Sequence, residues 1–124
     1  MAGLALAAVA LGAFNLVCTG TQYMDGSKKG KAYEITYRVS LDEGKWCENS
    51  CSKISEFASL EDNRISFNNE RIDTPRERRI SNIWVSRVTG EYRHFYRSLY
   101  GFFEIKGQCE KADFTGFPTY KTKF

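Results

Sequence analysis

Within residues 31–42, apolar residues occupy every second position from Tyr33 to Leu41. The apolar positions are Tyr33, Ile35, Tyr37, Val39 and Leu41. A period of two is typical of a strand that buries one face and exposes the other. Shorter runs of the same kind follow along the chain, between turns rich in Gly, Asn and Asp. We therefore predict an all-β domain, an antiparallel meander of about seven or eight short strands that forms a small barrel or sandwich.

Residues 73–79 carry the only helical signals in the chain. Thr74, Pro75 and Glu77 fit the N-cap, first-turn and capping-box positions of a helix. We expect one turn of helix there, followed by β-like sequence. The tail at residues 114–118 is expected to be irregular.

The first 17 residues carry no charge and consist mainly of Ala, Leu, Val and Gly. We interpret residues 1–13 as a signal peptide, cleaved before Phe14, and residues 14–124 as a single β domain. The alternative is a buried N-terminal strand or helix. A membrane span is disfavoured, because the stretch is shorter than the roughly 20 apolar residues that a spanning helix requires and Asn15 interrupts it. The expected location is periplasmic or secreted.

Four cysteines, Cys18, Cys47, Cys51 and Cys109, add a further constraint. An even number of cysteines in a short exported chain suits two disulfides, for which three pairings are formally possible. Cys18 and Cys109 each lie on the apolar face of a terminal strand, and Cys47 is close to Cys51 in sequence. We predict the pairs Cys18–Cys109 and Cys47–Cys51, the first of which would join the first strand to the last. A zinc site is disfavoured, because the chain has one histidine and no CxxC pair.

The sequence carries no recognisable catalytic motif. It has no G-x-S-x-G elbow, H-E-x-x-H pair, P-loop or Rossmann glycine pattern. The only histidine, His94, lies among aromatic residues in a strand, where a packing role is more common than general-base catalysis. The formal net charge of +3 gives only a weak general attraction to nucleic acid. The basic groups around Lys28 and Arg78 have acidic neighbours, which is typical of a solvated surface. We therefore predict no enzyme activity, no cofactor, no metal site and no nucleic-acid partner.

Residues 83–97 form two β-rich runs around the link Val88-Thr89-Gly90. A three-residue link with Gly90 in the left-handed conformation would place Trp84 opposite His94. One solvent-facing side of the hairpin would then present aromatic groups for stacking on a partner. The binding face predicted in this way consists of Trp84, Tyr92, His94 and Tyr96. A two-residue turn would instead pair Trp84 with Phe95 and turn His94 inward.

Four segments of the sequence resemble small exported proteins of Gram-negative bacteria that are known only as uncharacterised. These segments are FNLVCTGT (residues 14–21), RVTG (87–90), GQC (107–109) and FTGFP (114–118). This resemblance implies a periplasmic domain with paired cysteines and implies no activity. The chain is also more loosely similar to periplasmic inhibitors of c-type lysozyme, small β-barrels with a cysteine near each end and an inhibitory Ser-Gly loop. Cys18 and Cys109 match that outline, and Thr89-Gly90 stands in place of the Ser-Gly pair.

The functional expectation is a non-enzymatic periplasmic β domain that binds a protein or a cell-envelope glycan. The alternative is an inhibitor of a lysozyme-like lytic enzyme. A third hypothesis, an enzyme that uses His94, is the least favoured.

Overall fold

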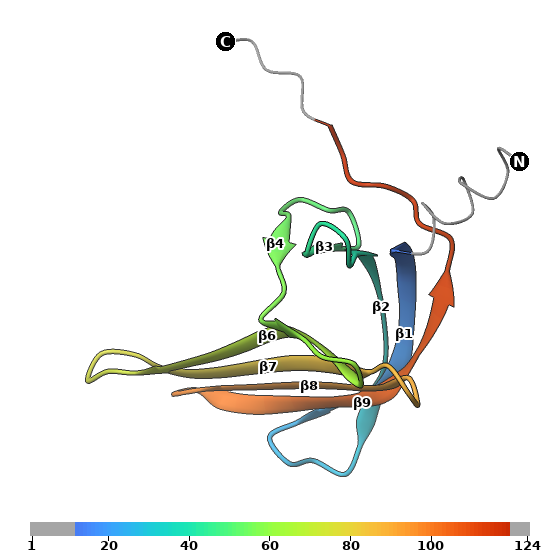
Figure 1. Cartoon of the computed structure of the whole chain (residues 1–124). Helices are drawn as coiled ribbons and strands as arrows, with labels where there is room; N and C mark the ends of the chain where they lie inside the picture. Colours follow the sequence, from blue (N-terminus) through green and yellow to red (C-terminus); the bar gives the residue numbers. More distant parts are fainter. Residues whose placement is uncertain (1–11, 120–124) are drawn as a thin grey trace, which may run out of the picture.

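A computed structural model describes residues 12–119, which fold into nine strands and no helix (Figure 1). The all-β prediction is confirmed. Of the predicted signal peptide, residues 1–11 lie outside the described residues, and Ala13 is the first residue of a strand. The strands are β1 (Ala13–Met24), β2 (Gly30–Ser40), β3 (Lys45–Glu48), β4 (Ser55–Glu56), β5 (Ser59–Leu60), β6 (Arg64–Asp73), β7 (Arg78–Ser86), β8 (Glu91–Ser98) and β9 (Gly101–Ala112).

The strands form one sheet in the order β4-β3-β2-β1-β9-β8-β7-β6-β5, with antiparallel pairing throughout. The sheet curls into a half-barrel whose hydrogen-bond ladder stays open, because β4 and β5 are its two edges. Only Phe57 and Ala58 separate these edges in sequence. The backbone N–H of Phe57 donates to Gly44, and that of Ala58 donates to Ser66. The covalent chain therefore spans the gap between the two edges.

Two parts of the sheet stand at an angle to each other. β1 and β2 stand upright at one end of a longer ledge formed by β6, β7, β8 and β9, and β3 pairs with the upper end of β2 (Figure 1). β9 pairs with both β1 and β8, and Gly107 of β9 lies opposite Gly20 of β1. A Cβ atom at Gly107 would collide with the carbonyl oxygen of Thr19, and one at Gly20 would collide with that of Lys106. The close approach of the two strands at this point therefore requires glycine on both.

The core lies in the angle between the two parts of the sheet. The alternation seen in the sequence corresponds to β2, whose Ile35, Tyr37 and Val39 are buried. The ring of Tyr37 stacks on Phe67 of β6 with centroids 4.3 Å apart. Its hydroxyl oxygen lies 2.6 Å from that of Tyr92 of β8, and burial raises the pKa of both hydroxyls. Aromatic packing and one buried hydrogen bond thus join β2 to β6 and β8 of the ledge.

Both predicted disulfides are confirmed. Cys18 of β1 and Cys109 of β9 are direct partners in the strand register and are bonded to each other. The second disulfide, Cys47–Cys51, closes a short loop after β3. Cys18 and Cys47 are fully buried, so each bond also contributes to the core.

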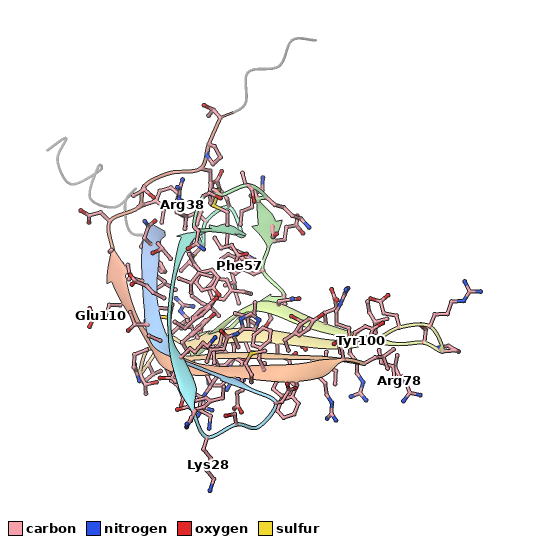
Figure 2. All side chains as sticks on the ribbon, turned by 180° about the vertical axis from the view of Figure 1, so that it is seen from behind. Lys28, Arg38, Phe57, Arg78, Tyr100 and Glu110 are labelled. Carbon is pink, nitrogen blue, oxygen red and sulfur yellow. A yellow bond between two sulfur atoms is a disulfide. The ribbon has the colours of Figure 1, made fainter. Side chains whose placement is uncertain are left out.

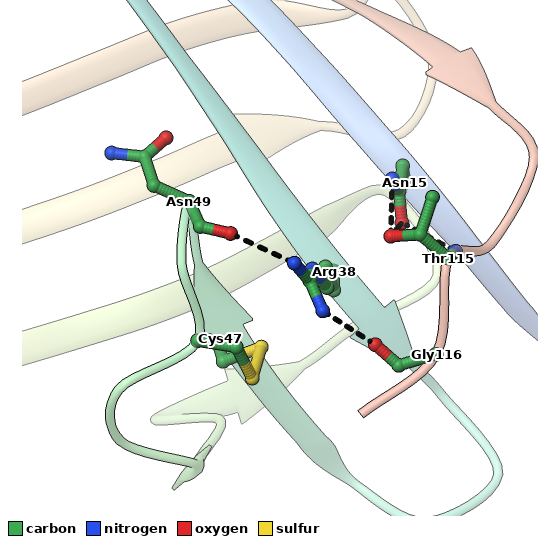
Figure 3. Close-up of a disulfide and its surroundings, with 7 residues drawn as sticks. Asn15, Arg38, Cys47, Asn49, Thr115 and Gly116 are labelled. Carbon is green, nitrogen blue, oxygen red and sulfur yellow. Dashed lines mark hydrogen bonds between the residues drawn. A yellow bond between two sulfur atoms is a disulfide. The ribbon is translucent and has the colours of Figure 1, made fainter. Parts of the chain in front are cut away.

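The segment after β9 is irregular, and side chains hold it against β1 and β2 (Figure 3). The side-chain amide of Asn15 donates to the Thr115 hydroxyl at 3.0 Å, and the backbone N–H of Thr115 donates to Asn15 Oδ1 at 3.3 Å. Arg38 donates to the carbonyl oxygens of Gly116 at 3.0 Å and Asn49 at 3.2 Å. The guanidinium group therefore ties the C-terminal segment to the loop of the Cys47–Cys51 disulfide.

Four segments, residues 14–21, 87–90, 107–109 and 114–118, contact one another near the Cys18–Cys109 disulfide. Asn15 holds Thr115, and the backbone N–H of Cys109 donates to the carbonyl oxygen of Gly90 at 2.8 Å. Gly90 has a φ of 79°, and a Cβ atom there would lie 2.8 Å from the carbonyl oxygen of Cys109. These contacts give residues of all four segments a structural role at this end of the half-barrel.

The prediction of a helical turn in residues 73–79 is wrong. These residues include the tight turn between β6 and β7, in which the backbone N–H of Thr74 donates to the carbonyl oxygen of Glu77 at 2.8 Å. The backbone N–H of Glu77 donates in return to the Thr74 hydroxyl at 3.0 Å. The contact expected at a helix N-terminus is therefore present, but it closes a hairpin because the flanking strands pair with each other.

Candidate binding surface

The structure divides the predicted binding face between the two sides of the sheet. Tyr92, His94 and Tyr96 pair with inward-facing residues of β7 and belong to the inner face of the half-barrel. Trp84 pairs with Arg93 and belongs to the outer face. The prediction that these four residues share a solvent-facing surface is therefore wrong. Tyr92 is also fully buried, so a partner cannot reach it.

The β7–β8 link explains the error in register. The link has four residues, 87–90, because β7 ends at Ser86 and β8 begins at Glu91. The Ser86 hydroxyl accepts the backbone N–H groups of Val88 and Thr89, and the carbonyl oxygen of Ser86 accepts that of Gly90. The predicted left-handed Gly90 is confirmed, but the link is one residue longer than predicted. In a strand pair a shift of one residue changes which residues share a face.

His94 and Tyr96 meet around one aromatic ring on the inner face. The ring of Phe103 stacks on Tyr96 with centroids 5.3 Å apart and meets His94 edge-on at 5.0 Å. His94 Nδ1 is buried and has no hydrogen-bond partner among residues 12–119. Burial lowers the pKa of His94 to about 4, so its imidazole is neutral at pH 7. His94 is therefore a neutral aromatic side chain that packs at the border of the core.

The outer face of the ledge carries a hollow that contains Trp84. Its volume is about 310 Å³, and its lining includes Asn82, Phe95 and Arg93. Arg93 lies 3.4 Å from a carboxylate oxygen of Glu91 and 3.4 Å from one of Glu104, the latter across the β8–β9 ladder. Trp84 and Phe95 are half-buried, so part of each ring remains open to solvent. The hollow thus combines aromatic rings with an amide and a fixed cation.

A second hollow of about 410 Å³ lies farther along the ledge, toward the end where Figure 2 shows Arg78 and Tyr100. Arg71 of β6, Ile80 of β7 and Arg97 of β8 face one another in consecutive strands and line it. Arg78, which also lines it, is paired with Asp73 at 3.3 Å. The second hollow is therefore more basic than the first.

Two arginines of the outer face lie against aromatic rings. The guanidinium carbon of Arg64 lies 4.0 Å from the centre of the Trp84 ring, and that of Arg97 lies 5.9 Å from the centre of the Phe102 ring. Arg64 and Arg71 were not singled out from the sequence. These two residues are seven positions apart and share the outer face only because the register of β6 shifts between Ser66 and Asn68, so period-two alternation could not have grouped them.

The most exposed apolar side chains lie away from this outer face, except Leu99, which lines the second hollow. They occupy turns, edges and strand ends: Met24, Leu60, Val88, Leu99 and Tyr100. A more apolar hollow of about 320 Å³ opens beside the 87–90 link and is lined in part by Phe14, Leu41 and Val85. The molecule therefore presents a mixed aromatic and cationic face on the ledge and an apolar hollow at the disulfide end.

Comparisons with known proteins identify no relative: no protein-family model, curated protein or solved structure matches the chain significantly. Among residues 12–119, no helix is long and apolar enough to cross a membrane. In the same part of the chain, no three His, Cys, Asp or Glu side chains are grouped so that they could hold a metal ion. The fold and its surfaces are therefore the basis for a functional proposal.

Proposed function

We propose that this protein is a non-enzymatic binding domain of the bacterial periplasm whose partner is a cell-envelope glycan. The observation that carries the proposal is the outer hollow of the ledge, where Trp84 and Phe95 lie beside Asn82 and Arg93. Partly exposed aromatic rings offer apolar surface to a sugar ring, and amide and charged groups at their edges can bond its hydroxyls. A protein partner is disfavoured at this hollow, because none of the strongly exposed apolar residues lines it.

The proposed compartment follows from the two disulfides and the apolar N-terminal stretch. Disulfides persist in oxidising compartments such as the periplasm. The full chain produced in a Gram-negative host should lose residues 1–13 on export, and mass spectrometry of the mature protein should detect Phe14 as its first residue. An intact Met1 on a cytoplasmic protein would contradict the compartment.

Sedimentation with insoluble peptidoglycan sacculi tests the binding function. The wild-type protein should sediment with the sacculi, and Trp84→Ala and Phe95→Ala should reduce the bound fraction at least fivefold. Tyr100→Ala is the matched control, because Tyr100 is 99% exposed and lies in a turn outside the hollow. Circular dichroism of each variant separates loss of binding from loss of fold. If all three variants bind as the wild type does, the outer hollow is not the site.

Tryptophan fluorescence supplies a second measurement. The chain has two tryptophans. Trp46 packs against Phe67 in the core at 5.1 Å, while Trp84 lies on the outer face. Soluble peptidoglycan fragments should change the emission of the wild type and of Trp46→Phe, but not that of Trp84→Phe. An unchanged spectrum in the wild type at millimolar fragment would contradict binding at this surface.

The alternative function, inhibition of a lysozyme-like lytic enzyme, is supported by the 87–90 link. Val88 is 78% exposed at its apex, and the link borders the apolar hollow at the disulfide end. An exposed apolar side chain on a hydrogen-bonded turn is suited to enter the cleft of another protein. If the chain is such an inhibitor, it should slow the clearing of a cell-wall suspension by c-type lysozyme. Val88→Asp should then abolish inhibition, whereas Tyr100→Asp should preserve it.

A further inference from the structure

The outer face of the ledge carries more positive than negative charge. Over the stretch where β6, β7, β8 and β9 pair with one another, its six cations are Arg64, Arg71, Arg78, Arg93, Arg97 and Lys106, and its three carboxylates are Asp73, Glu91 and Glu104. Each carboxylate is already within 4 Å of a cation: Asp73 is paired with Arg78, and the two glutamates are paired with Arg93. The face therefore has a formal charge of +3, equal to that of the whole chain. A ligand of this face would meet a local cationic excess.

Three of these arginines make no ion pair among residues 12–119, and their positions are not random. Arg64 lies over Trp84 at 4.0 Å, and Arg97 lies near Phe102 at 5.9 Å. Arg71 flanks Ile80 on the side opposite Arg97. A guanidinium group that rests on an aromatic ring keeps its donor edge free and loses less side-chain freedom when it binds an oxyanion. The arginines are therefore arranged to bind anions rather than only to keep the surface soluble.

The three arginines form two groups at opposite ends of the face. Arg71 and Arg97 line the 410 Å³ hollow, and Arg64 lies near the other end of β6. At the rise per residue of a β-strand, Arg64 and Arg71 are separated by about 20 Å along β6. Between them are the Asn82 and Phe95 hollow and Glu104, which is paired with Arg93, whereas Glu91 lies level with Arg64 at one end. A ligand that spans the face can therefore place negative charge at its ends, on the arginines that make no ion pair, and an uncharged ring over Phe95 between them.

We propose that the outer face of the ledge binds an acidic polysaccharide whose anionic groups are separated by neutral sugar surface. This inference rests on the proposed function and adds the class of glycan. The Arg71 and Arg97 hollow holds one anionic substituent, the Arg64 guanidinium on Trp84 holds another, and Phe95 contacts a neutral ring between them. Carboxylate and phosphate groups share the oxyanion chemistry that these arginines recognise.

Other polyanions fit this face less well. Each strand of DNA carries a phosphate about every 3.4 Å along the helix axis, so a bound strand would also place phosphates beside Glu104, between the two arginine groups. A flexible acidic peptide would gain its affinity from apolar side chains, and of the strongly exposed apolar residues among 12–119 only Leu99 borders the face. The position of Glu104 therefore favours a glycan whose charges are widely spaced.

Calorimetric titration of the full chain with oligogalacturonate tests the charge requirement. Methyl-esterified oligogalacturonate is the matched neutral ligand, and a phosphorylated oligosaccharide shows whether phosphate replaces carboxylate. The double variant Arg71→Gln with Arg97→Gln should bind the acidic oligosaccharide at least tenfold more weakly. Lys28→Gln with Lys29→Gln, which removes the same charge in the turn between β1 and β2, should change binding less than twofold. Raising the salt from 50 to 200 mM should weaken wild-type binding more than binding by the arginine variant.

The outcomes separate this inference from the proposed function. Equal affinity for the neutral and acidic oligosaccharides, with dependence on Phe95, would leave a glycan-binding domain and overturn the charge requirement. No binding of any oligosaccharide would overturn both proposals. Equal loss in the arginine and lysine double variants would show a general charge effect and overturn the site. Tighter binding of single-stranded DNA or polyglutamate than of any oligosaccharide would overturn the choice of ligand.

Discussion

Replacing His94 by phenylalanine should remove an acid-sensitive component of stability. The His94 imidazole packs edge-on against Phe103, and its Nδ1 is buried without a hydrogen-bond partner among the described residues. Its inner-face neighbours across the ladders are Ile83 and Ile105, and no charged group contributes to its pKa. Burial alone lowers the pKa to about 4, against about 6.5 in the unfolded chain.

The direction of the effect follows from proton binding in the two states. Between pH 6.5 and pH 4 the unfolded chain binds a proton at His94 and the folded chain does not, so the free energy of unfolding falls as the pH falls. The lowered pKa corresponds to at most about 2 kcal/mol between pH 7 and pH 5. Because the side chain is only half-buried, solvent screening reduces the expected loss to about 1 kcal/mol. Below pH 4 this contribution is completely lost.

Urea unfolding of the wild type and His94→Phe at pH 7, 6 and 5 measures this component. Phenylalanine keeps the edge-on contact with Phe103 and removes the titrating nitrogen. The carboxylates titrate alike in both proteins, so their contribution cancels in the difference. The wild type should lose about 1 kcal/mol relative to the variant between pH 7 and pH 5. A constant difference, or an NMR titration that gives His94 a pKa of 6.5 or higher, would refute the reasoning.

Two further predictions concern the covalent and steric constraints of the fold. Replacing Cys18 and Cys109 by alanine should reduce the free energy of unfolding by roughly 4–5 kcal/mol, against about 2 kcal/mol for Cys47 and Cys51, because the first pair closes a much longer loop. Denaturant unfolding decides this, and an equal or larger loss in the second variant would contradict the loop argument. Gly107→Ala should cost roughly 1–3 kcal/mol, because its methyl group would meet backbone atoms of β1. A thermal midpoint within about 1 °C of the wild type would show that β1 and β9 can move apart without a loss of stability.

One residue of the candidate surface was within reach of sequence reasoning. The predicted binding face contained Trp84, which lines the outer hollow. The pairing of β6 with β7 and of β7 with β8 brings Arg71 beside Ile80 and Arg97, although these residues are distant in sequence. No local pattern records that proximity. The arginine groups of the outer face therefore became visible only once the strands were assembled.

The sequence by itself determined the all-β class and both disulfide pairs. Alternation shows which residues of one strand share a face. Because Cys18 and Cys109 each lie on the apolar face of a terminal strand, the favoured pairs were Cys18–Cys109 and Cys47–Cys51. Only the tertiary structure decided which faces of neighbouring strands coincide. Alternation within each strand is the same whatever the length of the link, but each residue added to the link shifts the register between the two strands. The four-residue 87–90 link therefore placed Trp84 on the outer face and His94 on the inner one.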